Sequence, residues 1–288
     1  MTIFNLGSVN ADRFYRLPHL VQPGETIAAT STYEGLGGKG TNMSVAASRA
    51  GSDVCHVGAV GADGVWAVDR IKGYGVDTHY LIEVNAPTGH AIIMVDDGGE
   101  NAIVIYPGAN RAIPERLVKD ALGAANHGDL VLIQNETCHQ VLMAQSAWER
   151  GLKVAYAAAP FDLDAVQAVL PYTDYLILNE LEMQQLEEAT GMTPPELPLH
   201  DVVVTLGARG CVWYDNSTGL QTQFAAPKVN VVDTTGAGDT FTGYLIAGLD
   251  QGLAMPEAIK RAQIASAIMV TRKGTADVIP TLEEVTAF

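Results

Sequence analysis

Apolar and polar positions follow two different rhythms along this 288-residue chain. From about residue 113 onward, short apolar runs such as DLVLIQ and DVVVTLG alternate with longer segments such as PERLVKDALGAA, whose apolar residues recur every three or four positions. The short runs are typical of strands buried on both faces, and the longer segments are typical of helices that pack on one side. Strands that alternate with helices predict an α/β fold, in which helices cover both faces of a mostly parallel sheet.

The first third of the chain departs from this rhythm. Residues 27–36 are polar and rich in threonine, which suits an exposed strand better than a core strand. Residues 91–106 (AIIMVDDGGENAIVIY) contain two β-branched runs joined by Asp-Asp-Gly-Gly, the strongest hairpin signal in the sequence. We therefore expect a small separate β layer, drawn from about residues 10–36 and 88–108, within a single domain that spans 1–288.

Several residues that can bind a ligand follow the expected strands. In doubly wound folds, ligands bind beyond the carboxyl ends of the strands. The residues at such positions come from distant parts of the chain: Asn10, Asp12, Glu136, Asn179 and Gly207. Because candidate ligand-binding residues follow several different strands, a ligand site at this edge of the sheet is a better interpretation than a chance cluster of polar loop residues.

Composition narrows the range of partners. Seventeen basic residues against thirty-three acidic residues give a net charge of −16. A surface this acidic repels nucleic acids and anionic membranes, so we expect neither as a partner. No apolar run approaches the length of a membrane span, and the first residues lack the basic and apolar regions of a signal peptide. We expect a soluble cytoplasmic protein, with Cys55 and Cys211 as buried free thiols.

The segment GLGGKG, residues 35–40, spells the GxGxxG pattern of dinucleotide-binding proteins. The strand before it is polar, whereas a Rossmann unit places this turn after its first core strand, so NAD binding is the weaker interpretation. A Walker phosphate loop is excluded because Lys39 is followed by glycine. The turn is better interpreted as a close approach of backbone to a ligand, with Lys39 supplying charge and Asn42 a hydrogen-bonding side chain.

The segment TTGAGDTF, residues 234–241, carries the clearest chemistry. Gly236 and Gly238 expose backbone N–H groups at the start of an apolar helical pattern, where unpaired donors and the helix dipole favour an anion. Asp239 follows at once and is stabilised as a carboxylate by the same field. A plain N-cap aspartate is the alternative, but two glycines and two threonines exceed what a cap requires. The arrangement suits phosphoryl transfer, with Asp239 accepting the proton of the attacking hydroxyl.

These two segments also identify a family. GGKGTN and DTTGAGDTF, in this order, resemble the two signatures of the ribokinase-like (PfkB) carbohydrate kinases, and the similarity covers nearly the whole chain. The resemblance implies an α/β core with a small β-sheet lid, and ATP-dependent phosphorylation of a sugar's primary hydroxyl. The leading hypothesis is a pentose kinase that converts ribose to ribose 5-phosphate. A kinase of another sugar or of a nucleoside is the first alternative, and a catalytically idle sugar sensor is the second.

The resemblance assigns roles to individual residues. It implies that Asp239 is the catalytic base, beside an anion hole formed by Gly236, Ala237 and Gly238. The sugar site that it implies consists of Asn10, Asp12, Gly38, Lys39, Asn42 and Glu136. On the nucleotide side it implies Asn179, Thr205, Gly207 and Gly210.

Metal ions and self-association are implied in the same way. Glu182 is similar to the family's acid that binds Mg²⁺ through water, so ATP and Mg²⁺ are the expected cofactors. A K⁺ loop is recognisable from Asp233, Thr235 and the carbonyls of Met269, Arg272 and Gly274. Val278 stands where the family typically has serine, so we expect weak or absent dependence on K⁺. Segment 191–200 lacks a helix that is typical of the family. The apolar hairpin 91–106 exceeds what a two-stranded ribbon can bury, which predicts a homodimer through the lid.

Overall fold

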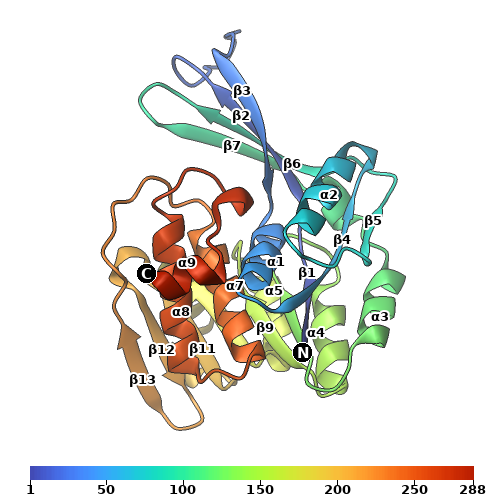
Figure 1. Cartoon of the computed structure of the whole chain (residues 1–288), viewed down its shortest axis with the longest axis vertical. Helices are drawn as coiled ribbons and strands as arrows, with labels where there is room; N and C mark the ends of the chain where they lie inside the picture. Colours follow the sequence, from blue (N-terminus) through green and yellow to red (C-terminus); the bar gives the residue numbers. More distant parts are fainter.

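The main body of the protein is a nine-stranded sheet with helices on both faces (Figure 1), as a computed structural model of residues 1–288 describes it. The strand order is β13-β12-β11-β10-β9-β8-β1-β4-β5, and only β12 and β13 run antiparallel to their neighbours. The predicted mostly parallel sheet is therefore confirmed. Its strands are β1 (Thr2–Leu6), β4 (Asp53–Val60), β5 (Leu81–Glu83), β8 (Leu130–Ile133), β9 (Lys153–Ala157), β10 (Tyr175–Asn179), β11 (Asp201–Thr205), β12 (Cys211–Asp215) and β13 (Leu220–Phe224).

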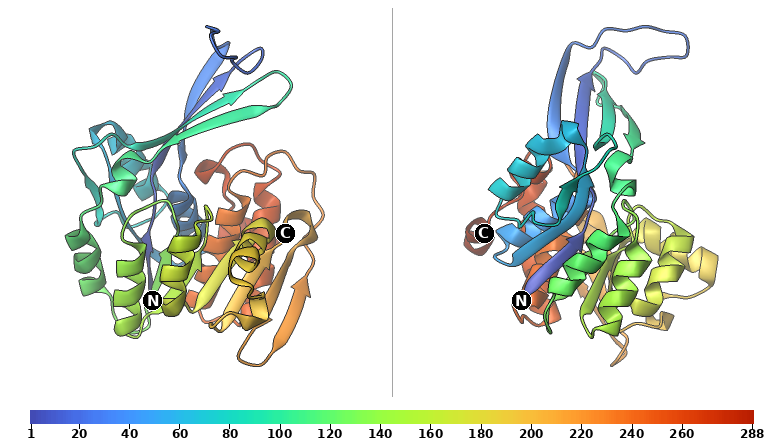
Figure 2. Two further views of the ribbon diagram at one scale, coloured as in Figure 1. Left: turned by 180° about the vertical axis from the view of Figure 1, so that it is seen from behind. Right: turned by 90° about the vertical axis from the view of Figure 1, so that its right-hand side faces the viewer.

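Two apolar cores lie on opposite faces of this sheet. Neighbouring residues of a strand point to opposite faces, so Leu130 and Leu132 of β8 join one core while Val131 and Ile133 join the other. Helices cover both faces (Figure 2). The first core lies under α1 (Lys39–Arg49), α2 (Val65–Gly73), α7 (Ala237–Asp250), α8 (Met255–Met269) and α9 (Leu282–Ala287). The second lies under α3 (Glu115–Ala124), α4 (Gln140–Glu149), α5 (Leu163–Val169) and α6 (Glu180–Thr190).

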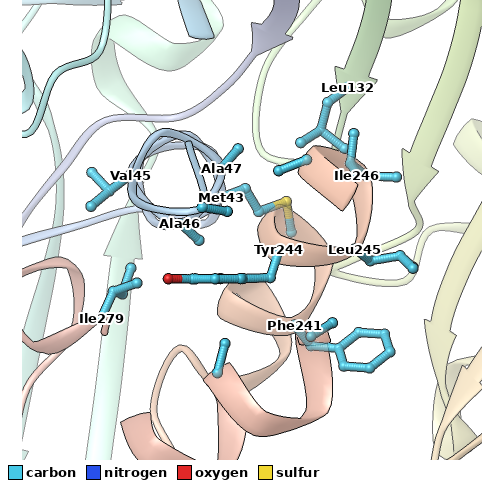
Figure 3. Packing of buried hydrophobic residues seen from close by; sticks show 14 of the residues in the cluster. Met43, Val45, Ala46, Ala47, Leu132, Phe241, Tyr244, Leu245, Ile246 and Ile279 are labelled. Atoms are coloured by element: carbon cyan, nitrogen blue, oxygen red, sulfur yellow. The ribbon is translucent and has the colours of Figure 1, made fainter. Parts of the chain in front are cut away.

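Helices α1 and α7 pack directly against each other, and this contact joins the two glycine-rich segments of the sequence. Tyr244 of α7 lies in the apolar interior close to α1 and Ile279 (Figure 3), and its hydroxyl donates to the Pro280 carbonyl at 2.7 Å. A Cβ added at Gly243 would stand 2.5 Å from the Met43 carbonyl oxygen, so only glycine permits this close approach. The N-terminal turns of the two helices are thereby brought together.

A second, four-stranded sheet projects from the main body (Figure 1), and we call it the small sheet. Its order is β3-β2-β6-β7, formed by β3 (Ser31–Gly37), β2 (Asn10–Arg16), β6 (Gly89–Val95) and β7 (Asn101–Tyr106). The pairing of β6 with β7 is antiparallel, which confirms the predicted hairpin. The edge strand β7 leaves four consecutive large apolar residues, Ile103 to Tyr106, exposed at 49 to 61%. The small sheet therefore has an uncovered apolar edge.

Short 3₁₀ turns complete the structure. They are η1 (Ala62–Gly64), η2 (Gly108–Arg111), η3 (Leu170–Tyr172), η4 (Pro194–Glu196), η5 (Gly207–Arg209) and η6 (Ala276–Val278). Segment 191–200 contains only η4, and the Asn216 side chain fastens it by donating to the Pro194, Leu197 and Leu199 carbonyls. Cys55 and Cys211 are buried free thiols, as predicted. No helix is both long and apolar enough to cross a membrane.

Candidate active site

Three carboxylates from distant parts of the sequence act on one another electrostatically where the small sheet meets the main body. Asp12 lies in β2, Glu136 lies in the loop after β8, and Asp239 lies in the first turn of α7. Burial, together with the negative charges of Glu136 and Asp239, raises the pKa of Asp12 from 3.8 to about 7. Asp12 is 9% exposed and its carboxylate accepts no hydrogen bond from the protein. A buried acceptor without a partner is a strong candidate for a ligand contact.

Glu136 is held by the turn that precedes α1. The Ser8 hydroxyl donates to Glu136 Oε2 at 2.5 Å, and the backbone N–H of Lys39 donates to the same oxygen at 3.0 Å. Ser8 also accepts the N–H of Gly40 at 3.1 Å, so one serine joins the end of β1, the GGKG turn and the Glu136 loop. Ser8 was not among the residues predicted from the sequence, although it directly precedes VNAD, the segment that supplies Asn10 and Asp12.

Lys39 and Asn42, both in α1, contact the predicted base. Lys39 Nζ lies 3.9 Å from Asp239 Oδ1, and Asn42 Nδ2 donates to Asp239 Oδ2 at 2.8 Å. The charge of Asp239 raises the pKa of Lys39, which burial alone would lower, and Glu136 adds to the rise. Asn42 Oδ1 is buried and has no hydrogen-bond partner. Lys39 therefore stays charged next to Asp239, and Asn42 keeps one buried acceptor oxygen without a partner.

The N-terminus of α7 has the features of an anion site. Gly236, its N-cap, is left-handed at φ 74°, a conformation that glycine adopts without strain. The backbone N–H groups of Gly238 and Asp239 donate to no acceptor in the protein. Asp239 is 7% exposed, whereas Gly238 lies at the surface. Free donors at the positive end of the helix dipole thus stand beside a buried carboxylate, as phosphoryl transfer requires.

The predicted nucleotide residues lie together at the ends of β10 and β11. Asn179 and Thr205 are register partners in these two strands. Asn179 caps α6 in a capping box: its Oδ1 accepts the N–H of Glu182 at 2.9 Å, and Glu182 Oε2 accepts the N–H of Asn179 at 2.8 Å. Burial raises the pKa of Glu182, while the charges of Lys39 and Asp239 act on it in opposite directions. Glu182 is thus within electrostatic reach of the predicted catalytic residues.

Gly207 and Gly210 form the loop that follows Thr205. Gly207 opens η5 with φ 58°, and Gly210 closes it with φ 96°. The N–H of Leu206 donates to the Gly210 carbonyl at 2.7 Å, which makes the loop a tight turn. This turn places exposed backbone next to the Asn179 end of β10. The structure therefore brings all four predicted nucleotide residues to one edge of the sheet.

The predicted K⁺ loop borders a separate cavity of about 240 Å³ between the small sheet and the loop after α8. Asp233, Thr235 and Gly274 line this cavity, and Met269 and Arg272 do not. Asp233 Oδ1 accepts the Thr235 N–H at 2.9 Å and Oδ2 accepts the Gly274 N–H at 3.3 Å. The Met269 carbonyl accepts the Arg272 N–H at 2.9 Å, at the end of α8. Two of the five predicted ligands thus do not line this cavity.

Two further residues were missed because no local pattern marks them. The Asn110 side chain, 1% exposed, pairs with the backbone of Val9 and with Asn10. Arg111 donates to main-chain carbonyls on both sides of Glu136. Both lie in η2, where the sequence YPGANR reads as an ordinary turn.

A carboxylate at the N-terminus of a helix, beside a lysine and further carboxylates in an α/β fold, is an arrangement that suits phosphoryl transfer to a polar acceptor. The sequence profile described as "pfkB family carbohydrate kinase" matches residues 2–282, and the chain belongs to this family. It is an ATP-dependent carbohydrate kinase by family.

Several relatives are similar to this chain over their full lengths. A ribokinase of Haemophilus influenzae is 33% identical over 303 aligned positions, covering 100% of this chain and 98% of the relative. The ribokinase of Thermotoga maritima has a similar structure, with a TM-score of 0.89, 30% identity and coverage of 100% and 98% of the two chains. The ribokinase of Arabidopsis thaliana, solved with ribose and ATP, has a TM-score of 0.87 and 29% identity, covering 99% of this chain and 97% of its own.

Proposed function

We propose that this protein transfers a phosphoryl group from ATP to the primary hydroxyl of a pentose, with ribose as the substrate and ribose 5-phosphate as the product. The observation that carries the proposal is the position of Asp239, buried in the first turn of α7 between free backbone donors and the side chains of Lys39 and Asn42. The full-length similarity to relatives named ribokinase supports the choice of acceptor.

The acceptor side is built for a neutral polyol. Asp12 and Glu136 supply acceptors for sugar hydroxyls, and a hydroxyl that donates to a carboxylate makes a charge-assisted hydrogen bond. Asn10, Gly38, Lys39 and Asn42 complete the site. Around it the carboxylates of Asp12, Glu136 and Asp239 outnumber the single ammonium of Lys39. This excess of negative charge disfavours sugar acids and sugar phosphates as acceptors.

The phosphoryl side relies on backbone donors. The attacking hydroxyl gives its proton to Asp239 as the bond to phosphorus forms. The predicted anion hole is the segment Gly236–Ala237–Gly238, whose N–H groups stabilise the negative charge on the transferred phosphoryl oxygens with help from the dipole of α7. The Ala237 N–H donates to the Thr234 carbonyl at 3.2 Å, so the free N–H of Gly238 is the better placed donor of the two. Lys39, 3.9 Å from Asp239, adds positive charge on the acceptor side. Asn179, Thr205, Gly207 and Gly210 hold the nucleotide at the neighbouring sheet edge.

Mg²⁺ fits this site as a companion of ATP rather than as a resident ion. No three histidine, cysteine, aspartate or glutamate side chains gather in a way that could hold a metal. Glu182 uses Oε2 in its capping box, which leaves Oε1 to orient a metal-bound water. When bound, Mg²⁺ would neutralise charge on the ATP phosphates. The protein contributes the water contact and ATP contributes the direct ligands.

K⁺ fits the predicted loop poorly. Both oxygens of Asp233 already accept backbone N–H groups, and the Val278 carbonyl accepts the Arg272 guanidinium at 3.1 Å. The Val278 side chain offers only methyl groups towards Gly274, where an added Cβ would meet them at 3.4 Å. Both Asp233 oxygens and the Val278 carbonyl are thus engaged, and the family's serine oxygen is replaced by methyl groups. We propose that turnover depends weakly on K⁺ or not at all.

The small sheet serves as the lid of the sugar site and as a dimer interface. The exposed residues Ile103 to Tyr106 form a continuous apolar strip on an unpaired edge strand, which isolated proteins avoid. A second copy of the chain would cover this strip. We place the homodimer in the cytoplasm.

A kinase of another sugar or of a nucleoside is the first alternative function, and an inactive sugar sensor is the second. ADP release should be measured with a panel of pentoses, hexoses, sugar acids and nucleosides, with ATP and Mg²⁺ present. We expect turnover with ribose to exceed turnover with every other acceptor. A nucleoside preference would favour the first alternative, and ribose binding without ADP release would favour the sensor.

A further inference from the structure

The turn η2 contacts both strand-end segments that carry the predicted sugar carboxylates. It follows β7 directly, so it begins where the small sheet returns to the main body. The N–H of Cys138 donates to the Asn110 carbonyl at 3.2 Å, and the N–H of Ala109 donates to the Pro87 carbonyl at 2.8 Å. These two main-chain hydrogen bonds attach η2 to the segments on either side of it.

The Asn110 side chain fixes the segment that carries Asn10 and Asp12. Its Oδ1 accepts the Val9 N–H at 2.9 Å, and its Nδ2 donates to the Asn10 Oδ1 at 2.8 Å and to the Val9 carbonyl at 3.3 Å. All hydrogens of the Asn110 amide are thereby used, which determines its orientation. Because Asn10 uses its Oδ1 here, the orientation of its own amide is set too, and its Nδ2 donors stay free for a ligand.

The Arg111 side chain fixes the segment that carries Glu136. Its guanidinium donates to the Thr137 carbonyl at 2.7 Å and to the Asn135 carbonyl at 3.2 Å, so it holds the peptides on both sides of Glu136. The planar fork of arginine can reach two carbonyls at once, which an ammonium group does less well. These hydrogen bonds hold Glu136 in place against repulsion by ionised Asp12. The repulsion is evident because the charge of Glu136 raises the pKa of Asp12.

We propose that Asn110 and Arg111 are positioning residues of the sugar site: Asn110 turns the Asn10 donors towards the acceptor, and Arg111 holds Glu136 opposite Asp12. This inference rests on the proposed function and adds two residues to it. Neither side chain contacts the predicted nucleotide residues, so the effect belongs to sugar binding rather than to ATP binding.

Arg111 is tested by comparing Arg111→Ala and Arg111→Lys with Arg150→Ala. Arg150 is a matched control, because it also donates to a main-chain carbonyl, that of Leu122 in α3, which carries no predicted site residue. We expect Arg111→Ala to raise the sugar KM by roughly 5–50-fold, with the ATP KM within about twofold and kcat within about threefold of wild type. Arg111→Lys should recover part of the loss.

Asn110 is tested by a double-mutant cycle with Asn10. Asn110→Asp keeps the acceptor for the Val9 N–H and removes the donor to Asn10, and Asn10→Ala removes the group that Asn110 orients. If Asn110 acts through Asn10, Asn110→Asp should raise the sugar KM by roughly tenfold in the wild-type background and by less than about threefold in Asn10→Ala. Asn110→Ser is the second variant, in case the carboxylate prevents folding.

The outcomes separate this inference from the proposed function. Equal rises in sugar KM and ATP KM, an Arg111→Ala enzyme no different from Arg150→Ala, or full additivity in the cycle would overturn the positioning roles while ribose kinase activity stood. A wild type that releases ADP with nucleosides and with no sugar would overturn the proposed function, and the positioning of a sugar with it.

Discussion

Replacement of Asp12 by asparagine should make the free protein more stable while it weakens sugar binding. Asp12 is 9% exposed, accepts no hydrogen bond from the protein, and faces the negative charges of Glu136 and Asp239. Asparagine has the same shape and carries no charge. The variant therefore removes a buried charge for which we propose a role only when a sugar is bound.

The magnitude follows from the pKa of Asp12. Its pKa is 3.8 in the unfolded chain and about 7 in the folded protein, and each pH unit between the two corresponds to about 1.4 kcal/mol. A raised pKa means that the folded state binds the proton more tightly than the unfolded state does. Protonated Asp12 therefore does not reduce the free energy of unfolding below pH 3.8, and that free energy falls as the pH rises from 3.8 to about 7. Ionisation of Asp12 thus lowers the free energy of unfolding by up to about 4 kcal/mol above about pH 7, and by about 1.6 kcal/mol near pH 5.

Urea unfolding of wild type and Asp12→Asn at about pH 5 and about pH 8 measures this difference. We expect the variant to gain about 1–4 kcal/mol near pH 8 and clearly less near pH 5, because wild-type Asp12 binds its proton there. Ribose should raise the melting temperature of wild type and should do so much less for the variant. A gain that does not change with pH, or a variant less stable than wild type at both values, would refute the reasoning.

Three further outcomes are expected. Asp239→Asn should fold normally and bind ATP about as well as wild type, with kcat lowered by roughly 10²–10⁴-fold; turnover within about threefold of wild type would reduce Asp239 to a helix cap. Ile105→Lys should convert the dimer to a monomer at micromolar concentration, as light scattering would report, since a charge on the exposed edge of β7 opposes pairing; a monomeric wild type would contradict the interface. Turnover should be nearly equal in K⁺ and in a large organic cation, and a strong K⁺ requirement would show that backbone carbonyls suffice without an oxygen at Val278.

The predicted elements owe their accuracy to local periodicity. Consecutive apolar residues in β8 belong to opposite cores, so a strand buried on both faces leaves an unbroken apolar run in the sequence. The β6–β7 hairpin was equally visible, because β-branched runs around a glycine-rich turn have few other solutions. Segment 234–241 was recognisable as a helix start because glycines before a carboxylate satisfy the needs of a helix N-terminus.

Contacts between distant segments were decided by the tertiary structure alone. Asp12, Glu136 and Asp239 are each separated by more than a hundred residues, and only the strand order and the packing of α1 on α7 bring them together. The rise in the Asp12 pKa to about 7 depends on burial and on those neighbours, neither of which a local pattern encodes. No local pattern marks Ser8 or Arg111 either. Ser8 is notable because it donates to the Glu136 carboxylate, and Arg111 because it donates to two main-chain carbonyls.

The sequence by itself determined the order and type of the elements and the chemical identity of the groups that could act. It did so because helices, strands and turns are governed by interactions between residues a few positions apart. The tertiary structure decided which of those groups meet, how deeply each is buried, and which charges act on it. It alone could do so, because electrostatic energies and hydrogen bonds depend on distances in space that the spacing along the chain leaves open.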